Sequence, residues 1–450
     1  MDPALSTAEK GHLRQQITNV PKADGPAHYA VAQVAELLEA SYMQRWARVV
    51  TTPNFTVERF GRSIASHMLD AGFSSEHLHG LIRRHNTSAH GVMLADICED
   101  LHAELTRSPP RSFEVLLAFR RKPTLAHGIP GDWLQGRAVT GWLTAHGFDT
   151  SDVRASVGIL LSVEARDGTG AAQAAREISD RFAARARIAL GKPLERLPWL
   201  WVAGDPQRVR HASESRGVRV KELDREGRIF SVTPSDSLDA AIELLAHLDE
   251  SSPPAAIAGG WGAIEGLLAD PGDRATAADN LAVLVACSFP RAELTALSYR
   301  AAEADAAVAA QLAGLASNRE RSRATAQLIL QNQFPTMQAW ADKAAVARVR
   351  KLLQDPSSEL TTIKEAIAEA FHRLYRQRNL ILHGGRLNSV ALKASLRTVA
   401  RLAGAGIDRI THGRYVQAAR PLELVARADL SIALINRQTA VSCVDLLEPV

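Results

Sequence analysis

The chain is poor in cysteine, and its histidines form no metal-binding pattern. Its three cysteines, Cys98, Cys287 and Cys443, stand far apart with no CxxC pair. This spacing argues against a disulfide framework or a zinc cluster, and it predicts a reducing, cytoplasmic environment. The fifteen histidines are scattered, without HExxH or a similar ligand spacing. We therefore expect no metal and no cofactor.

Long apolar runs are missing as well. No stretch of eighteen or more apolar residues occurs, because charges or prolines interrupt the longest candidates. We therefore expect no membrane span. The first residues, MDPALSTAEKGHLRQQ, lack the apolar core of a secretory signal.

Aromatic residues make up 5% of the sequence, and alanine-rich segments are common. This composition favours helices over sheets, so a mainly α fold class is expected. A length of 450 residues predicts two or three domains. The net charge of +4 is mild, but residues 343–427 hold sixteen Lys and Arg against six Asp and Glu. A segment this basic can attract phosphate backbones, although a solvated helical surface explains it equally well.

Residues 1–150 are predicted to form an N-terminal helical region of unknown role. Apolar residues recur there at helical spacing, and Pro- or Gly-containing segments separate the periodic stretches. The predicted helices are His28–Val49, Val57–Ala71, Val92–Leu105 and Trp133–His146. Nothing in this region carries an evident active site.

Residues 151–250 have a different pattern, which predicts a small central α+β domain. Short β-like runs alternate there with helical stretches. The predicted strands are Ser156–Ala165, Leu197–Ala203, Val218–Leu223 and Ile229–Val232. The predicted helices are Ala171–Ala189 and Leu238–Leu248.

The turn Asp167–Gly170 in this region suggests a dinucleotide-binding loop. The third glycine or alanine of a GxGxxG fingerprint would fall at Gln173, so the fingerprint fails. An ordinary strand-to-helix turn is the better interpretation.

A domain boundary is predicted at Ser251–Pro254, the clearest linker signal in the chain. Helical patterns continue from there almost to the end, and no strand is expected in residues 255–440. This part of the chain is predicted to be an all-helical domain.

One helix of this domain ends in a set of polar residues. The segment Thr361–Gly385 reads TTIKEAIAEAFHRLYRQRNLILHGG, and Arg378 falls on its apolar stripe. An arginine on such a stripe is costly unless it is paired or faces a cleft. His383 follows five residues later, which on a straight helix places it about 140° away. The pair can converge if the helix ends there, and the glycines at 384 and 385 favour such an end.

These residue types suit cleavage of RNA without a metal. A histidine can take the proton of the 2′-hydroxyl or protonate the departing 5′-oxygen. An arginine can neutralise the charge that builds on the phosphate. Asn379 could orient either group or hold a phosphate oxygen. The bare Arg-x(4–6)-His spacing is common, and a histidine at a helix C-terminus is also stabilised by the helix dipole alone.

The sequence RQRNLILHGG at 376–385 resembles the Arg-Asn-x-x-x-His signature of HEPN domains. Many HEPN domains are metal-independent ribonucleases of defence and toxin systems. Upstream, GGWGAIEGLL at 259–268 is similar to the first helix of the Apea-like HEPN subgroup. Trp261 and Glu265 stand there at matching spacing, and Glu265 lies on an apolar stripe of its own. Two opposite charges on inward stripes could meet, and a structural ion pair would explain them as well as a catalytic role would.

The resemblance covers less than half of the chain and implies an antiparallel helical bundle over residues 255–440. It also implies a homodimer or higher homo-oligomer, with two Arg/His sets facing a shared cleft. The implied catalytic set is Arg378, Asn379 and His383, with Glu265 as a further member. Tyr375 and Arg376 lie close enough in sequence to the catalytic set to bind RNA. It is equally possible that Tyr375 only borders the apolar face of the helix and that Arg376 is only a solvated surface residue.

The function expected from this resemblance is an endoribonuclease that leaves a 2′,3′-cyclic phosphate. It would act as a toxin or antiphage effector, regulated by its N-terminal half or by a partner protein. The alternative is a non-catalytic HEPN module that acts in RNA binding or protein assembly. A third interpretation, a nucleotide-dependent regulator, is weakened by the failed glycine fingerprint.

Overall fold

The computed structural model describes residues 41–50, 57–86, 93–125, 130–211, 215–233, 235–270, 272–383 and 390–448. It also describes the isolated positions 6–8, 11, 29, 32–33, 36, 39 and 128. The chain divides into two compact units, Met1–Ser213 and Glu214–Val450. The protein is mainly helical, as the composition predicts, with one small antiparallel sheet of five strands.

The first unit opens with a group of helices that share a core. The helices are α3 (Tyr42–Val49), α4 (Val57–Asp70), α5 (Ser75–Asn86) and α6 (Leu94–Arg107). Their apolar stripes meet around buried side chains such as Trp46 and Met68. The helices predicted at Val57–Ala71 and Val92–Leu105 are confirmed. Most of the predicted helix His28–Val49 lies outside the described residues.

The sheet of the first unit has the strand order β2-β3-β1-β4-β5, and all neighbours are antiparallel. The strands are β1 (Arg111–Phe119), β2 (Leu134–Gln135), β3 (Val157–Ala165), β4 (Arg196–Val202) and β5 (Val209–Arg210). Two helices accompany them, α7 (Gly136–Ala145) and α8 (Gly168–Leu190). The predicted strands at 156–165 and 197–203 and the predicted helix at 171–189 are confirmed.

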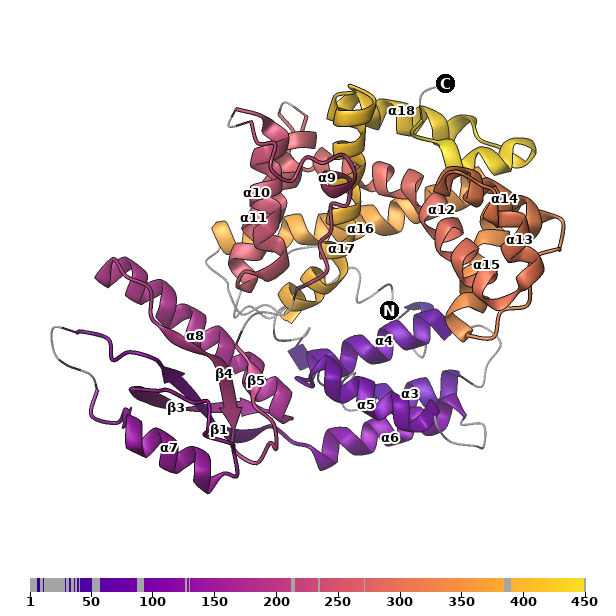
Figure 1. Cartoon of the computed structure of the whole chain (residues 1–450). Helices are drawn as coiled ribbons and strands as arrows, with labels where there is room; N and C mark the ends of the chain where they lie inside the picture. The colour runs from indigo at the N-terminus through magenta and orange to yellow at the C-terminus, as the bar shows by residue number, and fades with distance from the viewer. Residues whose placement is uncertain are drawn as a thin grey trace. The chain divides into compact units, whose positions relative to one another are not determined.

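The two faces of β1 bury different side chains, because successive residues of a strand point to opposite sides. Val115 and Leu117 pack with the alanines of α8, whereas Leu116 and Ala118 pack with α7. The two helices therefore cover opposite faces of the sheet (Figure 1). Buried on both faces, β1 has an apolar run in place of an alternating pattern.

Three predictions about where strands lie were wrong. Residues 1–150 are not helical throughout, because β1 and β2 lie within them. Val218–Leu223 is no strand: it joins no ladder and runs into the short helix α9 (Glu222–Arg225). Ile229–Val232 is no strand either, because its apolar side chains have no sheet to pair with and remain exposed.

The second unit is built of helices around one apolar core. They are α10 (Ser237–Glu250), α11 (Pro253–Leu268), α12 (Thr276–Ala304), α13 (Ala306–Ala313), α14 (Asn318–Leu330), α15 (Trp340–Gln354), α16 (Pro356–Leu382), α17 (Val390–Val416) and α18 (Pro421–Leu434), followed by the 3₁₀ segment η1 (Arg437–Asp445). The predicted helix at 238–248 and the helical character of 255–440 are confirmed. The segment Ser251–Pro254 forms the turn from α10 to α11 inside this unit, where Pro253 starts α11.

The long helix α12 lies at the centre of this core and contacts α11, α14, α16, α17 and α18. It is the one helix of the described residues that is long and apolar enough to span a membrane, with a hydropathy of 1.3. Because 61% of its most apolar window is buried inside the protein, its apolarity is accounted for by core packing.

Helix α17 packs closely on its neighbours through glycine. A Cβ at Gly406 would overlap with a leucine side chain of α12, and a Cβ at Gly413 would overlap with Leu424 of α18. Both leucines are buried, so neither can move aside freely. These two contacts set how near α17 lies to α12 and α18.

The segment before α10 is held on α17 by a buried carboxylate, Glu222. Its carboxylate lies 3.1 Å from Nδ1 of His412 and accepts a hydrogen bond from Arg225 at 2.5 Å. Its backbone N–H donates to Asp408 at 3.0 Å. Burial alone would raise the pKa of Glu222, but the hydrogen bonds from Arg225 and His412 outweigh it and hold the pKa below its ordinary value.

Candidate functional site at the end of helix α16

The candidate residues lie at the C-terminal end of α16, where the helix turns from core to surface. Asp355 caps the N-terminus of α16, and Pro356 occupies its first position. Phe371 and Leu374 are buried on its inner face, and Arg378 continues that face with 15% of its side chain exposed. The packing of α16 on α11 and α12 therefore fixes where this arginine lies.

Arg378 and His383 meet, although they stand five residues apart. The guanidinium NH1 of Arg378 lies 3.3 Å from Nε2 of His383. The helix ends at Leu382, and His383 has φ −107° as the C-cap residue. Its backbone N–H still donates to the carbonyl oxygen of Asn379 at 2.9 Å, so the two side chains meet across the last turn of the helix. Gly384 and Gly385, which we expected to end the helix, lie outside the described residues.

Asn379 completes the group. Its side-chain oxygen accepts a hydrogen bond from NH1 of Arg378 at 3.1 Å. Its amide nitrogen has no partner among the residues that the structure describes, so it can donate to a ligand. Because an arginine N–H can only donate, Nε2 of His383 is the acceptor in this contact.

Glu265 reaches the same place from α11. Its Oε2 accepts a hydrogen bond from Nε1 of the fully buried Trp261 at 2.6 Å and lies 4.0 Å from NH2 of Arg378. Its Oε1 lies 3.2 Å from Nε of Arg274. The carboxylate is thus fixed by Trp261 and shared between two arginines. A separation of 4.0 Å is an ion pair without a hydrogen bond, so Arg378 is held more tightly by Asn379 and His383.

Tyr375 and Arg376 have different surroundings. The ring of Tyr375 packs against Trp261, with 4.8 Å between the ring centroids. Tyr375 therefore supports Trp261 and, through it, Glu265. Arg376 is exposed and forms no hydrogen bond or ion pair with any residue that the structure describes. It is free to contact a ligand.

Sequence reasoning missed Arg274. It lies in the loop between α11 and α12, where no periodicity shows which residues face which neighbours. The nearest signal in the sequence was that Arg274 follows Glu265 by only a few residues. The structure places Arg274 on that carboxylate with 63% of its side chain exposed.

Among the described residues, no three His, Cys, Asp or Glu side chains gather in a way that could hold a metal ion. The described side chains offer an imidazole, a guanidinium, an amide and the carboxylate of Glu265. Such a group can move one proton and bind one phosphate.

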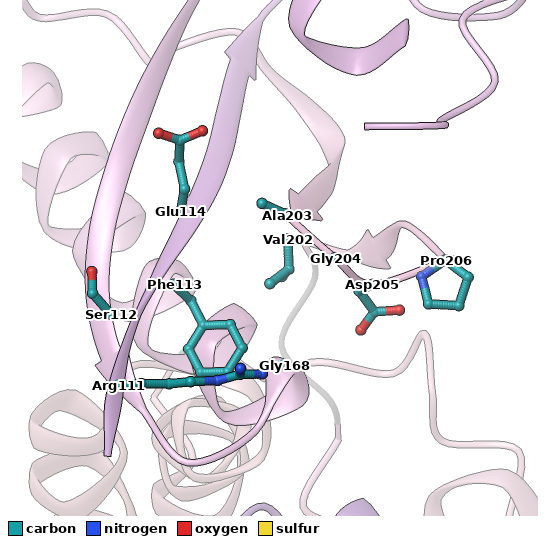
Figure 2. Close-up of a pocket in the computed structure, with 10 residues that line it drawn as sticks. All are labelled: Arg111, Ser112, Phe113, Glu114, Gly168, Val202, Ala203, Gly204, Asp205 and Pro206. Atoms are coloured by element: carbon teal, nitrogen blue, oxygen red, sulfur yellow. The ribbon is translucent and has the colours of Figure 1, made fainter. Parts of the chain in front are cut away.

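A pocket of about 700 Å³ lies elsewhere, in the first unit (Figure 2). It is lined by residues 111–114 of β1, by Gly168, and by residues 202–206, which begin at the last residue of β4. Figure 2 shows Arg111 beside Phe113, and the guanidinium carbon lies 4.6 Å from the ring centroid. The Asp205 carboxylate lies close to Gly168, the first residue of α8.

The N-terminus of α8 is occupied by carboxylates. Asp167 accepts hydrogen bonds from the backbone N–H groups of Gly170 and Ser74, each at 2.8 Å. With Asp205 also nearby, two negative charges already face the positive end of the helix dipole. A phosphate would be repelled there. The Asp167–Gly170 turn is an N-cap that also ties α8 to the helices before the sheet.

No family model, no curated protein and no solved structure matches this chain.

Proposed function

We propose that residues 255–440, within the second unit, form a metal-independent endoribonuclease of the HEPN type. The observation that carries the proposal is the 3.3 Å approach of Arg378 to His383 at the exposed end of α16. Asn379 lies on the same guanidinium, and Glu265 stands behind it. Acid–base catalysis of RNA cleavage needs such a titratable group beside a fixed cation.

The reaction follows from these positions. An RNA phosphate displaces NH1 of Arg378 from His383 and is bound by the guanidinium and by the amide of Asn379. Nε2 of His383 then takes the proton of the 2′-hydroxyl, and the 2′-oxygen forms a bond to phosphorus. The bond from phosphorus to the 5′-oxygen breaks, and that oxygen takes a proton from water. The products are a 2′,3′-cyclic phosphate and a 5′-hydroxyl.

The wider role is proposed on the same basis. The protein acts in the cytoplasm as a toxin or antiphage effector, and its first 250 residues or a partner protein restrain or target it. Two copies pair through the helical unit, so that two Arg/His sets face one RNA.

The experiment is to incubate the purified protein with total RNA in excess EDTA. We expect cleavage, with cyclic phosphate at the new 3′ ends. His383→Ala should lower the rate about 10²–10⁴-fold, the usual effect of losing a positioned acid or base. The matched control is His372→Ala, because His372 lies on the same helix but pairs with Asp279. If folded His383→Ala cut RNA as fast as the His372→Ala control, the assignment would be wrong.

One observation favours the alternative of a binding module without catalysis. In the structure, Nε2 of His383 already faces Arg378, so the pair can also be a static support for the guanidinium. A protein of this kind would bind RNA and release no products. The same incubation separates the two functions.

A further inference from the structure

A second arginine shares the Glu265 carboxylate with Arg378. Arg274 contacts Oε1 of Glu265 through its Nε atom, and Arg378 faces Oε2. The two guanidinium groups therefore lie on opposite oxygens of one carboxylate. One carboxylate therefore stands between two guanidinium groups.

The two arginines differ in which of their nitrogen atoms remain available to a ligand. NH1 of Arg378 is used by Asn379 and His383, and only 15% of its side chain is exposed. The closest approach of Arg274 to Glu265 is through Nε, and its two terminal nitrogens form no hydrogen bond within the described part of the chain. Its side chain is 63% exposed. Arg274 thus presents the open end of its planar fork to solvent, where it can bind a phosphate through two hydrogen bonds.

Arg274 is paired with a carboxylate that a buried tryptophan holds in place. Trp261 is fully buried and donates to Glu265 at 2.6 Å, and Glu265 in turn holds Nε of Arg274. Holding the long side chain at its Nε atom lowers the entropy lost when its terminal nitrogens bind a ligand. An exposed pair of this kind contributes little to folding, so stability does not account for the arrangement.

We propose that Arg274 is a second phosphate-binding residue of this site and takes a phosphate next to the scissile one in single-stranded RNA. Glu265 acts as a positioning residue that aims Arg274. The proposal rests on the function proposed above, because the neighbouring phosphate is defined by the cleavage at His383. It makes the RNA footprint longer than the Arg-Asn-x-x-x-His motif indicates.

The test measures the binding of a fully 2′-O-methylated RNA oligonucleotide, which cannot be cleaved because it has no free 2′-hydroxyl to attack the phosphate. Fluorescence anisotropy is recorded over a range of salt concentrations for the wild type, Arg274→Ala and Arg274→Lys. We expect Arg274→Ala to bind about 5–10-fold more weakly. The slope of log K against log[salt] should fall by about 0.7, the value for one contact with single-stranded nucleic acid. Arg274→Lys should keep the slope and lose part of the affinity, because it keeps the charge and loses the fork.

The matched control is Arg373→Ala. Arg373 is an exposed arginine of α16, five residues before Arg378, and therefore faces about 140° away. It should bind with wild-type affinity and slope. Thermal unfolding of Arg274→Ala should match that of this control, which separates a lost contact from a lost fold.

The outcomes separate this inference from the function on which it rests. An Arg274→Ala protein with wild-type affinity and salt slope overturns the role of Arg274, whether or not the wild type cleaves RNA. A wild type that binds the oligonucleotide no better than Arg274→Ala overturns it as well. If binding depends on Arg274 but natural RNA stays intact, then Arg274 binds RNA and the nuclease proposal fails.

Discussion

Replacing Arg378 by alanine should cost activity far more than it costs stability. The change removes the two hydrogen bonds of NH1, to Asn379 at 3.1 Å and to His383 at 3.3 Å, and the longer ion pair with Glu265. Breaking a buried ion pair costs about 3–5 kcal/mol when the other charge is left without a partner. Glu265 is not left alone here, because Trp261 and Arg274 still hold its two oxygens.

The expected loss is therefore that of two ordinary hydrogen bonds, about 2 kcal/mol in total. For a unit of this size, such a loss lowers the melting temperature by roughly 4–8 °C. Cleavage should fall about 10²–10³-fold, since the developing charge on the phosphate loses its fixed cation. Arg378→Lys should keep the stability better than the activity, because lysine keeps the charge without the fork.

The assay combines urea unfolding, followed by circular dichroism, with RNA cleavage under identical buffer conditions. A double-mutant cycle with Arg274→Ala tests the reasoning most directly. Removing both arginines leaves Glu265 with Trp261 alone, so the combined loss should exceed the sum of the single losses by about 1 kcal/mol. Strict additivity would refute the shared-carboxylate argument. An Arg378→Ala protein that fails to fold, or that cleaves at the wild-type rate, would refute the claim that Arg378 contributes more to activity than to stability.

Three further outcomes are expected. Light scattering should show at least a dimer, and a monomer with full nuclease activity would contradict the proposed pairing. Gly413→Ala should destabilise the protein by about 1–3 kcal/mol through overlap with α18, whereas Gly266→Ala, where a Cβ meets no atom within 4 Å, should not; equal urea midpoints would exclude the overlap. Glu222→Gln should destabilise the protein most at neutral pH. The pKa of Glu222 is below its ordinary value of 4.5 in the fold, so its contribution is complete above that pH and fades as the pH falls further; a urea-midpoint difference that grew towards acid would contradict this sign.

The sheet shows which strands a sequence reveals. β3 and β4 could be predicted because their apolar runs are bounded by turn signals and charged segments. β1 was missed because its run Val115–Phe119 is apolar throughout, a pattern that periodicity cannot separate from a buried helix. Ile229–Val232 has strand-like composition, but a strand needs a partner, and partners are a property of the whole fold.

The candidate site was predicted in part for a similar reason. Helical periodicity placed Arg378 and Glu265 on inward faces, and both faces are inward in the structure. Periodicity also predicted that His383 would diverge unless the helix ended, and α16 does end at Leu382. Arg274 belongs to a loop, where the position of a side chain follows from the packing of the two helices that the loop joins.

Glycine in α17 has a consequence for the order in which the second unit folds. A glycine inside a helix costs about 0.5–1 kcal/mol relative to alanine, so Gly406 and Gly413 leave α17 weak as an isolated helix. The close contacts they allow with α12 and α18 repay that cost only after those helices are in place. We expect α17 to form late, with its backbone amides protected from hydrogen exchange only when the whole unit is assembled.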